Sequence, residues 1–150
     1  MPEDARTARD IIVKEFRGTP YVARLLEVLG DALRFEDPEF LCLLAAPGES
    51  DPPSGLTVFG TVLGARLVTK VHAVVAPDPR VQIALLHAVR ETCVRSGERL
   101  VVCELPDDAP FDITRVALLA SGFREEGRID DFVRDGVALR LLVWRAGAAQ

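Results

Sequence analysis

The chain has 150 residues, 49% of them hydrophobic, so a single domain spanning residues 1–150 with one sizeable core is expected. Its formal net charge of −5 is spread along the sequence without a basic block, which argues against a nucleic-acid partner. Three cysteines without disulfide or zinc spacing, and no apolar run of the roughly 18 residues that span a membrane, predict a cytoplasmic protein with no metal and no membrane partner.

The N-terminal part is expected to hold a strand, a helix and a second strand. Residues 11–16 are β-branched and are followed by Gly18, which predicts the first strand. Thr19 and Pro20 fit the N-cap and the first turn of a helix. Apolar residues then recur at helical spacing, at Val22, Leu25, Leu26, Leu29 and Leu33. Residues 40–46 predict a buried strand.

The middle of the chain predicts a β-hairpin and a long helix. Residues 56–63 and 67–76 read as two strands joined by a turn that contains Gly64. Beyond them, one apolar helical face continues until Gly97 provides a C-cap. The residues of that face are Val81, Leu85, Ala88, Val89 and Thr92.

A strand and a helix begin the C-terminal third. Residues 100–104 form the expected strand. Asp112 is expected to cap a helix that ends at Gly122, with Phe111 packing on Val116 as a hydrophobic staple.

Two further strands are expected to end the chain. Residues 124–133 and 137–144 flank the pair Asp135-Gly136, which favours a tight primed turn. The apolar run in 137–144 has two interpretations, a central strand buried on both faces or a surface for a second copy of the chain. The predicted order is therefore β-α-β-β-β-α-β-α-β-β.

The spacing of polar and aromatic residues from Glu104 onward is the most specific pattern in the chain. It places, without a gap, Glu104, Thr114, Arg115, Leu118, Gly122, Phe123, Glu125, Arg128, Ile129, Asp131, Phe132, Val133 and Gly136. This spacing resembles Glu-x9-Thr-Arg-x2-Tyr-x3-Gly-(Phe/Tyr)-x-Glu-x2-Arg-Ile-x-Asp-(Phe/Tyr)-Tyr-x2-Gly, a pattern of the GNAT superfamily of N-acetyltransferases. The likeness covers roughly forty residues and extends more weakly upstream.

The resemblance implies an α/β (α+β) fold. Such a fold has one mixed, mostly antiparallel sheet of six or seven strands, splayed between strands 4 and 5 and flanked by helices. The usual second helix would be reduced to residues 34–39. The resemblance also implies direct transfer of an acetyl group from acetyl-CoA to a primary amine of a small molecule or peptide, and many such proteins form homodimers.

The resemblance implies where acetyl-CoA would bind. The backbone of Val74 and Val75 would hold the acetyl and pantetheine end. The pyrophosphate would meet Arg80, Val81, Gln82, Ile83 and Ala84. In the family this loop resembles (Arg/Gln)-x-x-Gly-x-(Gly/Ala), whose glycines let backbone N–H groups approach the phosphates. Here the loop has no glycine and is shorter.

Two residues are candidates for catalysis, and each has a structural alternative. His72 is either a base or substrate contact, or a half-buried strand histidine. Glu104 either orients the amine, or forms a salt bridge at a strand end. Leu118 stands where the family commonly has a tyrosine that protonates the leaving thiolate, and leucine cannot donate a proton.

Two functions therefore remain open from the sequence. One is an acetyl-CoA-dependent N-acetyltransferase. The other is a GNAT-fold binding or dimerisation module that does not use acetyl-CoA, an alternative that the glycine-free loop and Leu118 favour.

Overall fold

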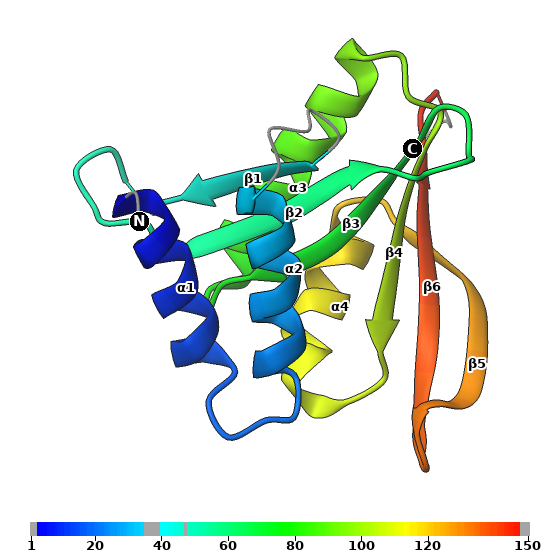
Figure 1. Ribbon diagram of the computed structural model, residues 1–150. Helices are drawn as coiled ribbons and strands as arrows, with labels where there is room; N and C mark the ends of the chain where they lie inside the picture. Colours follow the sequence, from blue (N-terminus) through cyan, green and yellow to red (C-terminus); the bar gives the residue numbers. More distant parts are fainter. Residues whose placement is uncertain (1–2, 35–39, 47, 148–150) are drawn as a thin grey trace.

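The structure is a computed structural model that describes residues 3–34, 40–46 and 48–147 (Figure 1). The elements, in chain order, are α1 (Glu3–Glu15), α2 (Val22–Arg34), β1 (Phe40–Ala45), β2 (Gly55–Thr61), β3 (Val68–Val75), α3 (Pro79–Arg95), β4 (Leu100–Pro106), the 3-10 turn η1 (Ala109–Phe111), α4 (Asp112–Ala120), β5 (Arg124–Arg134) and β6 (Val137–Arg145).

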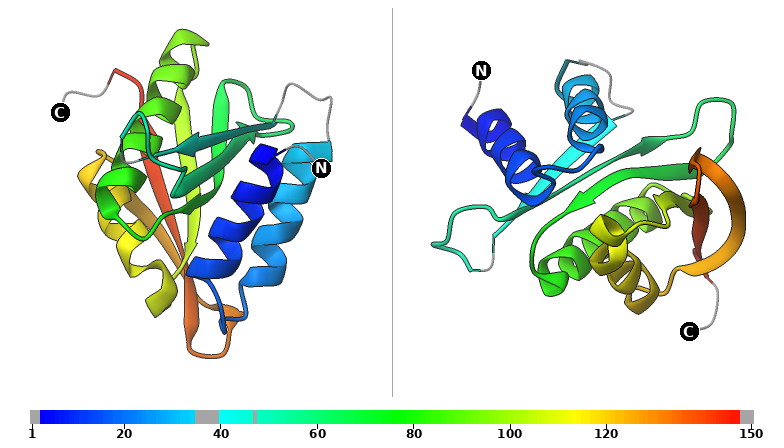
Figure 2. Two further views of the ribbon diagram at one scale, coloured as in Figure 1. Left: turned by 90° about the vertical axis from the view of Figure 1, so that its left-hand side faces the viewer. Right: turned by 90° about the horizontal axis from the view of Figure 1, so that it is seen from below.

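The strands form one mixed sheet of six strands in the order β1-β2-β3-β4-β6-β5. Only β3 and β4 pair in parallel, and the other four pairings are antiparallel. Helices α1 and α2 cover one face of the sheet, and α3 and α4 cover the other (Figure 2). The predicted mixed, mostly antiparallel sheet flanked by helices is confirmed, with six strands.

The strand predicted over residues 11–16 is wrong, because these residues belong to the end of α1 and the turn that follows it. The buried side chains of α1 and of the turn after it include Ala5, Ala8, Ile12 and Phe16. They recur every three or four residues and so line one face of a helix. The helical period was not recognised in the sequence because its first half lies among polar residues. Only the short β-branched run in its second half stood out.

The helix predicted after Thr19 is confirmed as α2, but it begins at Val22, so Thr19 and Pro20 precede the helix and do not provide its N-cap and first turn. The Thr19 hydroxyl accepts a hydrogen bond from the main-chain N–H of Tyr21 at 3.3 Å, just before the first turn. Leu33 is 47% exposed rather than buried, and the inward face of α2 consists of Leu25, Val28 and Leu29. The short helix predicted over residues 34–39 falls, beyond Arg34, outside the described residues.

The predicted hairpin and the helix after it are confirmed as β2, β3 and α3. Strand β3 is buried along most of its length because helices cover both faces of the sheet. Helix α3 ends where Gly97 adopts a φ of +73°, and the main-chain N–H of Glu98 bonds to the carbonyl of Cys93 at 2.8 Å.

The C-terminal elements are also confirmed, with three local corrections. The turn between β5 and β6 is not of the primed type, because Gly136 has a φ of +77° whereas Asp135 does not have a positive φ. Asp112 makes no capping hydrogen bond at the start of α4, and Val116 is 60% exposed, so it cannot be the staple partner of Phe111.

The apolar run of β6 lies between β4 and β5, which leaves β5 at the edge of the sheet. β6 is thus an interior strand, but it is not buried along its whole length, because Leu141 in its middle is 36% exposed. No helix in the described part of the chain has the length and apolar character needed to cross a membrane.

Candidate functional site

Strands β3 and β4 part halfway along their length, and a cavity lies between them. Their ladder joins Val68–Val71 to Leu100–Cys103, after which β3 continues to Val75 and β4 to Pro106 without pairing to each other. Each strand keeps its partner on the other side, β2 or β6. Beyond the ladder, the facing edges therefore carry main-chain groups that do not pair with the opposite strand.

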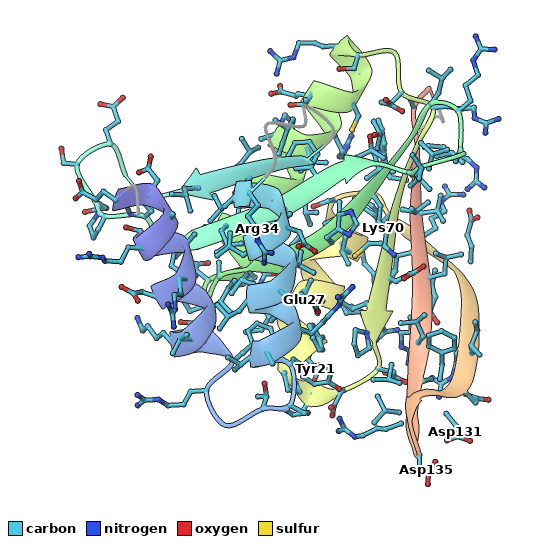
Figure 3. The ribbon with its side chains drawn as sticks, viewed as in Figure 1. Tyr21, Glu27, Arg34, Lys70, Asp131 and Asp135 are labelled. Carbon is cyan, nitrogen blue, oxygen red and sulfur yellow. The ribbon has the colours of Figure 1, made fainter. Side chains whose placement is uncertain are left out.

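The cavity has a volume of about 190 Å³ and is closed on one side by α2. Lys70 and Tyr21 both line it, and Figure 3 shows Lys70 on β3 well above Tyr21 at the base of α2. The other polar lining residues are Arg24, His72, Glu104 and Thr114. Sequence reasoning pointed to His72 and Glu104 for this site, and the structure brings both of them together there.

His72 is the extra residue of a β-bulge in β3. Val58 of β2 pairs with Ala73 and Phe59 pairs with Val71, so His72 has no residue opposite it. A bulge bends the strand and increases its local twist. This bend occurs at the residue after which β3 leaves β4, and it therefore contributes to the opening of the cavity.

The surroundings of His72 favour its neutral form. Burial lowers the pKa of its imidazole to about 4, the charges of Lys70 and Arg24 act in the same direction, and Glu104 opposes them. At neutral pH the ring is therefore uncharged. Its low pKa makes it a weak acceptor for a proton from an ammonium group, whose ordinary pKa is near 10.4.

The pKa of His72 predicts a loss of stability in mild acid. The unfolded chain takes up a proton near pH 6.5, whereas folded His72 does so only near pH 4, so protonation favours unfolding as the pH falls through this window. Between pH 7 and pH 4, we expect the free energy of unfolding to fall by about 2 kcal/mol less in His72→Gln than in the wild type, after allowance for the partly exposed ring.

Urea unfolding of both proteins across this range measures the effect. The control is His87→Gln, because His87 is an exposed residue on α3. Equal pH slopes for the wild type and His72→Gln would contradict the assignment.

Glu104 and Lys70 form an ion pair at one wall of the cavity. The Lys70 Nζ lies 2.6 Å from the Glu104 Oε2, and both side chains are partly exposed. The salt bridge that was one interpretation of Glu104 is thus present, and it holds the carboxylate at the edge of the cavity. Cys103, the next residue along β4, is not a nucleophile because burial raises the pKa of its thiol to about 12.

A second polar cluster lies beside the cavity at Tyr21, and no pattern in the sequence indicated it. The Tyr21 hydroxyl donates to the Asp108 carboxylate at 2.6 Å, and Arg134 of β5 binds the same carboxylate at 2.6 Å. These hydrogen bonds lower the pKa of Asp108, whereas burial and the Asp108 carboxylate raise the pKa of Tyr21. The three residues are far apart in the chain, so no local pattern links them.

The neighbouring Asp107 is held by two arginines. Arg140 and Arg128 donate to its carboxylate at 2.8 and 2.6 Å, and these bonds lower its pKa. Arg115 pairs with Glu125 at 3.6 Å. Arg115 and Arg128 thus tie helix α4 and the β4 end to the last hairpin.

The N-terminus of α3, where the resemblance places the pyrophosphate, is already capped by an aspartate. The Asp78 carboxylate accepts from the main-chain N–H of Arg80 at 2.8 Å, and its main-chain carbonyl accepts from Val81 and Gln82. The guanidinium of Arg80 also binds this carboxylate, with its Nη2 at 2.7 Å. The first N–H groups of the helix are therefore occupied by Asp78.

The other predicted cofactor contacts divide between two places. Val74 lines the cavity, and its carbonyl accepts from the Thr114 hydroxyl at 3.5 Å. Val75 is buried and, like residues 80–84, does not line the cavity. Gln82 is also buried, with its amide nitrogen bonded to the carbonyl of Ala76 at 2.8 Å. Leu118 is fully buried in the main core.

Among the described residues, the acidic and sulfur side chains do not form a metal site. Within residues 3–34, 40–46 and 48–147, no three histidine, cysteine or carboxylate side chains are arranged to hold a metal ion. The three cysteines are free thiols.

Comparison with known proteins gives a likeness in structure only. No family model and no curated protein matches the sequence. A Desulfovibrio desulfuricans protein assigned to the GNAT family of acetyltransferases has a TM-score of 0.81 and 18% identity, over 97% of this chain and 94% of its own.

Two further solved structures are similar to the chain. An aminoglycoside 6'-N-acetyltransferase in complex with coenzyme A has a TM-score of 0.75 and 10% identity, over 97% of this chain and 92% of its own. The ribosomal-protein-alanine N-acetyltransferase from Brucella melitensis has a TM-score of 0.71 and 14% identity, over 95% of this chain and 94% of its own. The splayed sheet and these likenesses together show that the chain has the GNAT fold.

Proposed function

We propose that this protein is an N-acetyltransferase that uses acetyl-CoA as donor and a primary amine as acceptor. The observation that carries the proposal is the cavity between the parted ends of β3 and β4, with the bulge at His72. A thioester with its pantetheine arm has the extended shape and the amide groups that the edges of two parted strands can bind. The fold neighbours described as acetyltransferases, one of them with coenzyme A, support this assignment.

The transfer joins the amine directly to the acetyl carbon. The amine must first lose a proton, because only its neutral form is a nucleophile. A C–N bond then forms, the C–S bond breaks, and the electron pair leaves with sulfur as the CoA thiolate. The nitrogen gives up a second proton to leave a neutral amide, and the thiolate takes up a proton to leave the free CoA thiol. Glu104, held by Lys70, is placed to hydrogen-bond the amine, and His72 contributes an uncharged polar wall.

The acceptor would enter past α2 and the hairpin of β5 and β6. This end of the cavity presents Tyr21 and Arg24, and the Asp108 carboxylate is neutralised by Arg134. The polar cluster of Tyr21, Asp108 and Arg134 would then orient the part of the acceptor that does not react.

A second candidate is a binding module of the same fold that does not use acetyl-CoA. The observation that favours it is the capped start of α3, because Asp78 occupies N–H groups that a pyrophosphate would need and adds a negative charge beside it. The burial of Leu118 agrees with this alternative, since no proton donor stands at that position.

Calorimetric titration with acetyl-CoA and with CoA tests the proposal. Arg80 is exposed and close to the start of α3, so an enzyme requires it to turn from Asp78 to the phosphates. We expect micromolar binding that weakens with added salt, and a loss of about tenfold in Arg80→Ala. Arg6→Ala, which removes an exposed arginine from α1 on the other face of the sheet, is the matched control.

The two candidate functions give different outcomes in this titration. Binding that depends on Arg80 and not on Arg6 supports the enzyme, and acetyl transfer to a panel of amines follows. No heat of binding up to millimolar ligand would reject acetyl-CoA as the substrate and favour the binding module.

A further inference from the structure

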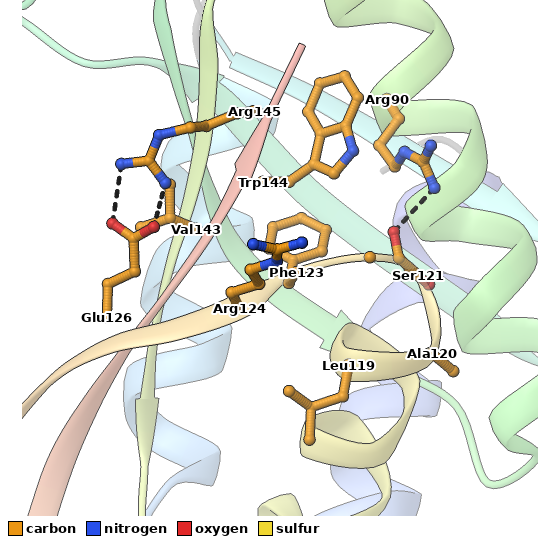
Figure 4. A pocket seen from close by; sticks show the side chains of 11 residues that line it. Arg90, Leu119, Ala120, Ser121, Phe123, Arg124, Glu126, Val143, Trp144 and Arg145 are labelled. Atoms are coloured by element: carbon orange, nitrogen blue, oxygen red, sulfur yellow. Dashed lines mark hydrogen bonds and ion pairs between the residues drawn. The ribbon is translucent and has the colours of Figure 1, made fainter. Parts of the chain in front are cut away.

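A second cavity lies on the α3 and α4 side of the sheet, away from the parted strands. It has a volume of about 470 Å³, within the range of small-molecule sites. Figure 4 shows it between the end of α4, the middle of α3, the start of β5 and the end of β6. We call this cavity the arginine pocket, because Arg90, Arg124 and Arg145 line it.

Two side chains at the arginine pocket have hydrogen-bond donors without a partner among the described residues. The Arg90 Nη1 donates to the carbonyl of Ser121 at 2.7 Å, which fixes the guanidinium 4.9 Å from the ring of Trp144. Its Nε is buried and has no hydrogen-bond partner among the described residues. The indole N–H of Trp144 likewise makes no hydrogen bond with any described residue.

Arg124 adds a further positive charge beside Glu126, whose pKa is lowered first by its hydrogen bonds with Arg145 and also by the charge of Arg124. The Arg124 side chain is exposed, and no hydrogen bond or ion pair ties it to a residue within the described ranges. In the view of Figure 4, its guanidinium is drawn over the Phe123 ring and below Trp144. Arg145, by contrast, is bound to Glu126 through both of its terminal nitrogens.

The lining of the arginine pocket is therefore rich in donors and poor in acceptors. Its one carboxylate, Glu126, is bound by Arg145, and the Ser121 carbonyl is bound by Arg90. Three arginines face one carboxylate here, although the whole chain has a net charge of −5. Such a lining complements a group with several acceptor oxygens and a negative charge.

The backbone at the mouth of the pocket leaves room for a ligand. Gly122 has a φ of +86°, a conformation that glycine adopts readily, and it ends α4. A Cβ at this position would lie 3.6 Å from the Trp144 ring and 4.0 Å from the Arg90 Nη1. A larger side chain would therefore fill the space in front of Trp144 and Arg90.

We propose that the arginine pocket binds the phosphate or carboxylate group of a small organic anion, between Arg124 and the pair of Arg90 and Trp144. The site is separate from the proposed acetyl-transfer cavity, and Arg90 lies ten residues along α3 from Arg80, or about 15 Å at the helical rise. Its ligand is a second molecule and not the reacting thioester.

Fluorescence tests this site directly, because Trp144 is the only tryptophan in the chain. Inorganic phosphate, phenyl phosphate and benzoate are titrated into the intact protein while the Trp144 emission is followed. We expect a saturable change in the emission, and a binding constant about 10- to 100-fold weaker in Arg124→Gln. Arg9→Gln, which removes an exposed arginine from α1, should bind as the wild type does.

The choice of variant keeps the test independent of folding. Arg124 is exposed and unbonded to any described residue, so its replacement should leave the fold intact, which circular dichroism checks. Saturation by the two phosphates alone assigns a phosphate group, and saturation by benzoate as well assigns either anion. No saturable change with any probe, or equal binding in Arg124→Gln, would overturn the proposal.

Acetyl-CoA also carries phosphates, so it is titrated into Arg124→Gln as well. Under both proposals, the affinity for acetyl-CoA should depend on Arg80 and not on Arg124, and the phenyl phosphate signal should depend on Arg124 and not on Arg80. Failure of one proposal is thus distinguishable from failure of the other.

Discussion

Asp78→Asn is expected to tighten the binding of acetyl-CoA by about tenfold to a hundredfold. The Asp78 carboxylate occupies the Arg80 N–H and the Nε and Nη2 of the Arg80 guanidinium, at the point where the resemblance places the pyrophosphate. Asparagine removes the negative charge and releases Arg80, and charge-assisted hydrogen bonds to phosphate contribute roughly 1.5–3 kcal/mol each. Calorimetry of the wild type and the variant measures the gain.

The Asp78→Asn substitution should not destabilise the fold, so a difference in affinity from the wild type can be assigned to the carboxylate. Asparagine and aspartate are similar N-cap residues, so the free energy of unfolding should change by only a few tenths of a kcal/mol. Asp112→Asn is the control, because Asp112 is an exposed carboxylate at the start of α4 that makes no capping bond. Equal affinity in Asp78→Asn and the wild type would show that Asp78 is no barrier, and absence of binding in both would favour the non-catalytic module.

Leu118→Tyr is expected to lower the free energy of unfolding by about 3 kcal/mol and to add no catalytic acid. Leu118 has no exposed surface, and it packs in the main core rather than along the cavity between β3 and β4. A larger ring there costs about 1–3 kcal/mol in overpacking, and its buried hydroxyl costs about 1–3 kcal/mol more if it finds no partner.

Urea unfolding measures this loss, and the neighbouring position provides its control. Leu119 is 42% exposed, so Leu119→Tyr should change stability by less than about 0.5 kcal/mol. A stable Leu118→Tyr protein that transfers acetyl groups faster than the wild type would show that the ring reaches the cavity, contrary to the packing described here.

The sequence predicted most elements because their periods were long or their turns distinctive. The hairpin around Gly136 and the helix that ends before Gly97 each combine a hydrophobic period with a glycine of positive φ. Helix α1 was missed because its apolar face is interrupted by charged residues, and only the short run over 11–16 stood out. Strand propensity over six residues predicts a strand poorly when the same residues belong to a longer helical repeat.

The candidate site could be predicted only where it depends on single residues placed on strands, and not where it depends on contacts between residues distant in the sequence. Glu104 and His72 were placed by their strands, and both line the cavity. The contact between Tyr21 and Asp108 joins positions 87 residues apart, which no local pattern reveals. The cap at Asp78 did have a signal, since an aspartate followed by Pro79 is typical of a helix start.

The short ladder between β3 and β4 has a consequence for the motions of the molecule. Four residue pairs join the strands there, against six or seven pairs at each of the other four junctions of the sheet. The hairpins β2–β3 and β5–β6 are closed by short turns, whereas β3 and β4 are connected only through the crossover that contains α3. Local opening should therefore begin between β3 and β4. Any ligand that contacts both strands should slow their separation.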